Sequence, residues 1–401
     1  MNDSSFPAQA YIYDAVRLPR ARVRKHGGTL VELPPYELFG QLLAALESRS
    51  LPPELVDDVI VGLSTVTGEQ GGDLARAAVQ WAGWPDAIPG GVVSRLCCSG
   101  LDALESAAAR IASGMADIVV AGGVESMSRV PMLADRPAIA TDPDLGERTG
   151  FVTIGVSADL TAAVSGITRP ELDAYAVRSH QRALAAPQGN SLIPVRKGEA
   201  VLLDADEGAR SDASLEAFEQ LPALFGDDGA AWERVARRLP EAPRPAAGLH
   251  TLATAPQLAD GASASVIGTR SAAARLDRPP LAVIAGTAQA AVRSPLLTAP
   301  AIAAKAALHR AGITSADLDL IEVNESFAVT PLLLTRELDL EPNRVNPNGG
   351  ALAVGHPLGA TGGNLLALAL DELTRIDGEH ALLTIPAALG LASAVVIRRI
   401  R

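Results

Sequence analysis

Residues 92–106 read "VVSRLCCSGLDALES" and contain both cysteines of the 401-residue chain, side by side. The valines that precede the cysteines are typical of a β-strand, and residues 101–113 have the apolar spacing of an amphipathic helix. Gly114 follows as a helix stop. Cys97 and Cys98 are therefore predicted to lie at a corner where a strand passes into a helix.

This corner has two possible roles. Neighbouring Cα atoms are only ~3.8 Å apart, whereas a disulfide favours ~4.4–6.8 Å, so the two cysteines are not expected to bridge each other. At the start of a helix, unpaired N–H groups and the helix dipole stabilise a thiolate, as a nucleophile requires. A cysteine is also among the residues most often buried as a small hydrophobe. The corner by itself leaves both roles open.

Strand-like and helical segments alternate along most of the chain. Short β-branched runs predict buried strands, and Ala/Leu-rich stretches between them predict helices. The expected strands are 57–64, 116–123, 281–288, 318–326 and 393–400, and the expected helices are 36–48, 72–83, 101–113, 299–311 and 361–375. This alternation predicts an α/β fold built in layers.

The two ends of the chain resemble each other. "PELVDDVIVG" (53–62) is similar to "ADLDLIEVN" (316–324), and a glycine-rich turn follows in each half, at 89–100 and 348–363. The pattern predicts a duplicated α/β core. The predicted halves are 1–128, completed by 251–280, and 281–401. Between them, 129–250 is rich in Pro, Asp and Arg and contains loop-like runs, which predicts an inserted loop or cap domain.

The overall composition limits the partners. The chain is 48% hydrophobic and 20% charged, and its net charge of −12 argues against nucleic acid or an anionic membrane as a partner. The sequence contains no run of 18 apolar residues, so no membrane helix is expected. The first 20 residues lack the apolar core of a signal peptide. With no disulfide framework, a cytoplasmic protein is expected.

Two further segments carry candidate chemistry. His356 lies in the glycine-rich run "NPNGGALAVGHPLGATGG" (346–363), where glycines let the backbone approach a ligand closely. A histidine held there could act as a base, or could be a hydrogen-bonded histidine of a turn. Asn324 and Glu325 end a predicted strand, a usual ligand position in an α/β sheet, although Asn324 could also cap a turn.

Together these motifs resemble the thiolases, the acyl-CoA acetyltransferases of the condensing-enzyme superfamily. The resemblance covers most of the chain and follows the family's order. It rests on "DAVRLPRARVRKHGGTL" (14–30), "RLCCSGLDAL" (95–104), "GGVESMSRVP" (122–131), "NESFA" (324–328) and the glycine-rich run around His356. It implies a thiolase-like duplicated α/β core, layered αβαβα, with an inserted loop domain.

The resemblance also implies roles for individual residues. Cys97 would accept the acyl group, His356 would take its proton, and Asn324 would position a water beside the histidine. Cys98, where the family has a small residue, would serve packing. The residues implied to bind substrate are Ile154, Ala255, Pro256, Ser326 and Phe327. No metal and no permanently bound cofactor are expected; a coenzyme A thioester is the implied substrate, and a homodimer or homotetramer the implied assembly.

The sequence departs from the family near its C-terminus. Thiolases carry a second cysteine in a C-x-G-G-G-x-G loop, and the matching stretch here, 382–396, has Thr384 at the cysteine position and Pro386 at the first glycine. A threonine hydroxyl is a weak acid and base at neutral pH. Proline has no N–H to offer an oxyanion.

Three functions remain open from the sequence. The first is thiolase-type acyl transfer through an acyl-Cys97 thioester, to or from CoA or an acyl-CoA. The second keeps the acyl-cysteine but ends in hydrolysis or in decarboxylative condensation. The third is a catalytically impaired thioester-binding or assembly subunit. The missing second cysteine, replaced by Thr384, is the reason for the second, and Pro386 and Pro256 are the reason for the third.

Overall fold

A single 11-stranded sheet runs through the protein in the computed structural model, which describes residues 9–25 and 27–401. Its main path joins, in spatial order, β11 (Leu320–Val323), β12 (His380–Ala387), β13 (Leu391–Arg399), β10 (Ala282–Ala291), β1 (Tyr11–Arg17), β9 (Ala259–Gly268), β6 (Ile118–Glu125), β4 (Asp58–Gly62) and β5 (Gly91–Val93). The short strands β2 (Ala21–Arg24) and β3 (Gly27–Gly28) extend it beside β9, and β7 (Val195–Lys197) and β8 (Ala200–Leu203) form a separate pair.

The order of the strands repeats. In the N-terminal half, β4 is parallel to β6, and β6, β9 and β1 are successively antiparallel. In the C-terminal half, β11 is parallel to β12, and β12, β13 and β10 are successively antiparallel. β4 and β11, which carry the similar sequences, occupy equivalent positions. The predicted duplicated core is confirmed, and the pairing of β1 with β10 joins the two halves.

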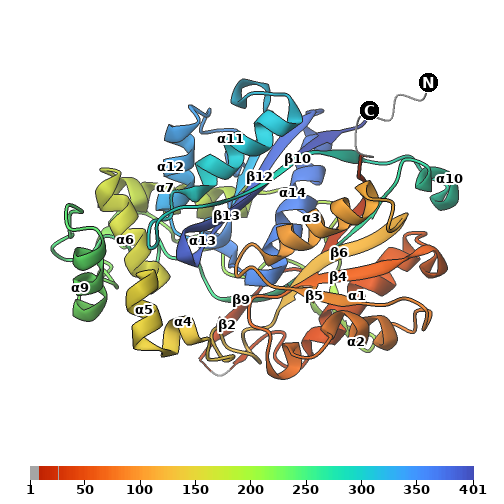
Figure 1. The fold of residues 1–401 in the computed structure, drawn as a ribbon, viewed down its shortest axis with the longest axis horizontal. Helices are drawn as coiled ribbons and strands as arrows, with labels where there is room; N and C mark the ends of the chain where they lie inside the picture. The colour runs from red at the N-terminus through yellow and green to blue at the C-terminus, as the bar shows by residue number, and fades with distance from the viewer. Residues whose placement is uncertain (1–8, 26) are drawn as a thin grey trace.

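Helices complete the predicted αβαβα layers. The central layer consists of α3 (Ser99–Ala112) and α14 (Thr361–Arg375), which contact each other and strands of both halves. The outer layers are α1 (Pro35–Ser48) with α2 (Leu74–Trp81) on the N-terminal half, and α11 (Ala299–Ala311) with α12 (Val329–Glu337) on the C-terminal half. Figure 1 shows the two halves in red to orange and in cyan to blue, with α3 and α14 between them.

The segment 129–250 contains six helices, which its loop-like composition did not predict, and the rest of it is mostly loop. The two runs predicted to be loops, 204–212 and 239–248, carry no helix or strand. Its helices are α4 (Ala138–Thr141), α5 (Pro143–Thr149), α6 (Ile154–Val164), α7 (Arg169–Ala185), α8 (Leu215–Glu219) and α9 (Gly229–Arg238). Thr168 and Glu171 form a capping box at the start of α7. The buried residues of α6 and α7 pack with those of α12, so tertiary contacts override the loop-like composition.

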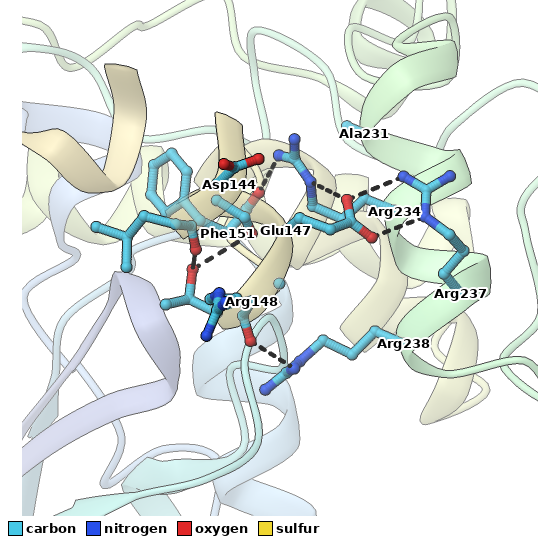
Figure 2. Close-up of polar contacts among 12 residues, drawn as sticks. Asp144, Glu147, Arg148, Phe151, Ala231, Arg234, Arg237 and Arg238 are labelled. Carbon is cyan, nitrogen blue, oxygen red and sulfur yellow. Dashed lines mark hydrogen bonds and ion pairs between the residues drawn. The ribbon is translucent and has the colours of Figure 1, made fainter. Parts of the chain in front are cut away.

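Ion pairs hold α9 against α5. Glu147 accepts hydrogen bonds from Arg237 at 2.8 and 3.0 Å and from Arg234 at 3.3 Å, and these arginines lower the pKa of Glu147 to about 2. Arg234 also donates to the Phe151 carbonyl at 2.6 Å. Figure 2 shows these contacts, with Arg238 donating to a carbonyl below them. Because the pairs are largely exposed, each contributes little stability, and they mainly define how the two helices meet.

All five predicted strands and all five predicted helices are present, with ends shifted by a few residues. The long strands β1, β9 and β12 were not predicted as strands. Nearly every residue in them is buried, so they show little of the apolar–polar alternation that marks a half-exposed strand. The remaining helices of the described residues are brief: α10 (Ala272–Leu276), α13 (Ala351–Val354), η1 (Pro53–Leu55), η2 (Gly68–Gln70), η3 (Ser315–Asp317), η4 (Leu358–Ala360) and η5 (Ala388–Gly390).

No single helix within the described residues is long and apolar enough to cross a membrane. One bent pair, Pro143–Val164 with Arg169–Ala185, meets the test by length and composition only, with 118° between its parts. The predicted absence of a signal core concerns the first 20 residues, of which 1–8 lie outside the described residues.

Glycines allow the start of α3 to touch the segment around η4. A Cβ on Gly100 would lie 2.6 Å from the Gly359 carbonyl oxygen, and one on Gly123 only 2.0 Å from the same atom. A Cβ on Gly362 would lie 2.2 Å from the Leu101 nitrogen. Such distances are impossible for any residue with a side chain, so backbone packs directly on backbone where the central helices meet.

Gly362→Ala is therefore expected to destabilise the fold by about 1–3 kcal/mol or more, because the backbones of α3 and α14 must separate. Urea denaturation measures the change. Gly229→Ala, at the exposed start of α9, is the matched control, since a Cβ on Gly229 meets nothing within 4 Å. Equal stability of the two variants would contradict the close packing described for this junction.

Candidate active site

Cys97 lies in the tight turn between β5 and α3. Ser99 shapes the turn: its hydroxyl accepts the Arg95 N–H at 2.8 Å and lies 2.6 Å from the Leu96 carbonyl oxygen. Leu96 has a positive φ of 51°, which turns the chain sharply before the helix. The predicted strand-to-helix corner is thus present. The hydrogen bonds of Ser99 fix the shape of the turn that carries Cys97.

The two thiols are buried and protonated. Cys97 is 7% exposed, and burial, together with the neighbouring Cys98 and Glu125, raises the pKa of its thiol far above the ordinary value. Burial also raises the pKa of Cys98 to about 12, and its S–H donates to the Ile385 carbonyl at 3.3 Å. A helix-stabilised thiolate is one of the two roles that the sequence leaves open for this corner. The loss of hydration outweighs the helix dipole here, so Cys97 needs a base.

His356 is held in one orientation by hydrogen bonds. Its backbone N–H donates to the Gln257 carbonyl at 2.9 Å, and its Nδ1 lies 2.7 Å from the Thr361 hydroxyl. That hydroxyl donates to the Pro357 carbonyl at 3.1 Å, so it must accept from Nδ1–H. The assigned tautomer leaves a lone pair on Nε2. Burial, with a smaller contribution from Arg20, lowers the pKa of His356 to about 3.

Asn324 links His356 to β12. Its Nδ2 lies 3.3 Å from His356 Nε2 and donates to the Ser326 hydroxyl at 2.6 Å, and that hydroxyl donates to the Pro386 carbonyl at 3.3 Å. The Asn324 backbone N–H donates to the Thr384 carbonyl at 2.9 Å. The end of β11 therefore carries a continuous polar chain from Pro386 to the imidazole, and all its side chains are buried.

The segments that carry Cys97 and His356 are in direct contact. Gly100 and Gly359, which form the contact between α3 and η4, lie three residues after Cys97 and three residues after His356, respectively. Glu125 strengthens the junction, because its carboxylate accepts N–H groups from Gly359 and Ser64, each at 2.8 Å. Glu125 is fully buried, and burial raises its pKa.

A second buried carboxylate, Glu325, fastens the Asn324 loop to α7 and α13. It accepts hydrogen bonds from Tyr175 at 2.9 Å, from Ser179 at 2.7 Å and from the Leu352 N–H at 3.0 Å. Glu125 and Glu325 both lie within motifs quoted from the sequence, yet no supporting role was assigned to them. Their partners come from distant segments, which spacing along the chain does not reveal.

Three of the expected substrate-binding residues meet in one apolar cluster. Phe327 is buried there, and Ile154 and Ala255 pack against it half-buried. Phe225 and His250 contact the Phe327 ring edge-on, with ring centroids 5.8 and 5.2 Å away. Of the other two expected residues, Pro256 follows Ala255 and is half-buried, whereas Ser326 belongs to the polar chain.

The positions that differ from the expected pattern lie on β12. Thr384 is fully buried, and its hydroxyl donates to the Ser393 carbonyl at 2.9 Å across to β13. Pro386 pairs with Ala392 in register and offers only a carbonyl. The loop after β12 contains the short helix η5 (Ala388–Gly390), in which Leu389 has a φ of 67°. β12 therefore has no thiol at position 384 and no backbone N–H at position 386.

A cavity of about 970 Å³ lies elsewhere, and its lining includes none of Cys97, His356 and Asn324. Across residues 9–25 and 27–401, no group of three or more His, Cys, Asp or Glu side chains could hold a metal ion.

Comparison with known proteins gives the family. The model of the thiolase N-terminal domain matches residues 11–232, and that of the thiolase C-terminal domain matches residues 278–399. The 3-oxoadipyl-CoA/3-oxo-5,6-dehydrosuberyl-CoA thiolase of Escherichia coli (strain K12) is 34% identical over 421 residues, covering 98% of this chain and all of the relative.

Solved structures of thiolase-family enzymes have the same fold as this chain. The crystal structure of the Bacillus anthracis acetyl-CoA acetyltransferase superposes with a TM-score of 0.85 at 29% identity, over 99% of this chain and 100% of that chain. Human mitochondrial 3-ketoacyl-CoA thiolase superposes with a TM-score of 0.86 at 28% identity and the same coverage. The chain therefore belongs to the thiolase family, and it is a thiolase-type acyltransferase that works with coenzyme A.

Proposed function

We propose that Cys97 is the nucleophile of this acyltransferase and that His356 is its base. The Cys97 sulfur attacks the carbonyl carbon of an acyl-CoA, and the bond from that carbon to the CoA sulfur breaks. The thiol proton passes to His356 Nε2 and from there to the departing CoA thiolate. The observation that carries the proposal is the imidazole with Nδ1–H bound to Thr361 and a lone pair on Nε2, on a segment packed against the start of α3.

A neutral thiol beside a neutral imidazole suits this reaction. The charged pair forms only when the acyl-CoA occupies the site, and a site that excludes water strengthens the interactions that stabilise developing charge. Asn324 would hold the imidazole and position a water beside it. Ile154, Ala255, Pro256, Ser326 and Phe327 would bind the acyl and pantetheine parts of the substrate.

The names of the relatives support acyl-CoA or 3-oxoacyl-CoA thioesters as the substrate class. We expect no resident cofactor. Thr384 and Pro386 favour a second candidate, in which the acyl-cysteine is released by hydrolysis or by a decarboxylative condensation. Neither outcome requires a side chain to remove a proton from a second acyl-CoA. Asn324 with its water would serve hydrolysis.

The assembly and the domain limits belong to the same proposal. We expect a homodimer or homotetramer, and β5 is a short edge strand with half-buried residues, a form that a second copy can pair with. The halves would be 1–128 with 251–280 and 281–401, and 129–250 the inserted cap. A cytoplasmic location fits an enzyme that uses coenzyme A.

Acylation is tested by incubating the protein with acetyl-CoA and measuring the intact mass. We expect one acyl adduct on the native protein, none on Cys97→Ala, and an unchanged adduct on Cys98→Ala. Cys98→Ala is the matched control because that thiol donates to the Ile385 carbonyl and serves packing. An adduct that persists in Cys97→Ala but disappears in Cys98→Ala would reverse the assignment.

Thiolysis of acetoacetyl-CoA tests the missing groups on β12. Thr384→Cys alone should raise the rate only partly, because Pro386 still offers no N–H. Adding Pro386→Gly should raise it by a further factor of about 10²–10³, the usual effect of one oxyanion donor. Pro386→Ala separates the donor from backbone freedom, since alanine also has an N–H. Native activity as high as that of the double variant would contradict this reading.

The protonation state of His356 is testable through stability. Its pKa is lowered from 6.5 to about 3, so between these values the folded state binds fewer protons than the unfolded state. The free energy of unfolding then rises with pH, by up to about 1.4 kcal/mol per pH unit from this residue. His356→Gln should remove that slope in urea denaturation between pH 5 and 7.

A further inference from the structure

The ring of Phe327, which is proposed to bind the acyl group, touches two other rings. Phe225 and His250 both meet it edge-on, with ring centroids 5.8 and 5.2 Å away and interplanar angles of 78° and 81°. Phe327 is 4% exposed, and His250 is fully buried. The Leu224 N–H donates to the His250 carbonyl at 3.0 Å, which fixes the segments of the two neighbouring rings to each other. The Phe327 ring therefore has little room to turn.

Asp159 holds the imidazole of His250 in one orientation. Its Oδ1 accepts the backbone N–H of His250 at 2.8 Å and lies 2.8 Å from the ring Nδ1. A carboxylate only accepts hydrogen bonds, so in the assigned tautomer Nδ1 carries the proton and donates it to Asp159. Asp159 lies on α6, which begins at Ile154, whereas His250 lies on the segment that carries Ala255. The pair thus joins two segments that carry expected substrate-binding residues.

The same pair leaves polar atoms without partners. Nε2 of His250 and Oδ2 of Asp159 are buried and have no hydrogen-bond partner among the described residues. Buried polar groups are nearly always paired, and apolar side chains of similar volume often replace a buried pair without loss of stability. Stability alone does not explain the imidazole. Its distinctive property is a flat ring, held rigidly by Asp159, against Phe327.

The backbone on either side of Phe327 is fixed as well. Ser326, the residue before it, donates to the Pro386 carbonyl at 3.3 Å within the polar chain of the site. Ala328, the residue after it, donates its N–H to the Thr254 carbonyl at 3.0 Å. Because the backbone is held on both sides, the place of the Phe327 ring depends on its side-chain torsions, which the touching rings restrict.

We propose that His250 is a specificity-determining residue of the acyl site. Its imidazole, held by Asp159, keeps the Phe327 ring in place, and that ring limits the length of the acyl group that Cys97 accepts. The enzyme then favours short acyl chains over long ones. A smaller side chain at position 250 lets the ring move back and makes room for further methylene groups. This inference rests on the proposed function, in which Cys97 is acylated and Phe327 binds the acyl group.

The rates of CoA release from acetyl-CoA and from octanoyl-CoA test the proposal. We expect kcat/KM in the native protein to be higher for acetyl-CoA by about tenfold or more. His250→Asn keeps a donor for Asp159 but lacks the ring, and it should reduce this preference by about tenfold, the usual effect of a change of one methylene group in an apolar pocket. His250→Val should do the same, and its apolar side chain suits the buried position if His250→Asn fails to fold.

His180→Asn is the matched control. His180 is also a buried histidine that meets a phenylalanine edge-on, with its ring centroid 5.9 Å from that of Phe218. Neither of these two residues is among those expected to bind substrate, so His180→Asn should keep the native preference for acetyl-CoA. An equal loss of preference in this control would overturn the proposal, because the effect would then be a general one on the packing of the protein.

Binding separates this proposal from that of catalysis by Cys97. Calorimetric titration of Cys97→Ala with the same two thioesters gives the ratio of their Kd values, and adding His250→Asn should shift that ratio toward octanoyl-CoA by about tenfold. This shift is expected even if Cys97 proves not to be acylated. Equal use of both thioesters by the native protein, or ratios that His250→Asn and His250→Val leave unchanged, would show that His250 does not determine chain length.

Discussion

Direct packing of backbone on backbone, at the junction of α3 with the segment around η4, is the constraint on which the rest of the structure depends. Gly100, Gly359 and Gly362 have no side chains, and their atoms occupy space that any Cβ would need. The two central helices can therefore begin at the same place, although one follows a strand of the N-terminal half and the other the glycine-rich loop of the C-terminal half. Glu125 binds across this junction and satisfies the Gly359 N–H.

The chemistry of the site follows from that closeness. Burial at this junction deprives both the Cys97 thiol and the His356 imidazole of hydration, which favours the neutral form of each. The Thr361 hydroxyl, which donates to the Pro357 carbonyl and so accepts from Nδ1–H, determines that Nε2 of His356 carries the lone pair. Burial thus raises the pKa of the Cys97 thiol. The same burial strengthens electrostatic interactions with any charge that develops during the reaction, because the local dielectric is low.

β12 distinguishes this chain from the pattern its motifs resemble. Thr384 uses its hydroxyl within the sheet, on the Ser393 carbonyl, and Pro386 contributes only an acceptor. Both substitutions fit the strand without distorting it, since Thr384 favours β-structure and Pro386 keeps its register with Ala392. The fold therefore accommodates Thr384 and Pro386 at the positions where the resemblance implies a cysteine and a glycine, and this is the structural basis of the second candidate function proposed above.

The sequence by itself determined the α/β class, the duplication and the segments that carry Cys97, Asn324 and His356, because periodicity and glycine placement are local properties. It did not reveal β1, β9 and β12, whose nearly complete burial removes the alternating pattern, or the helices of 129–250, whose apolar faces are covered only by distant elements. Only the tertiary structure decided that Cys97 is a neutral thiol, that Thr361 orients His356, and that Arg17 and Arg20 share Asp206 beside a cavity. Burial and charge compensation depend on which segments meet in space, and spacing along the chain carries no record of that.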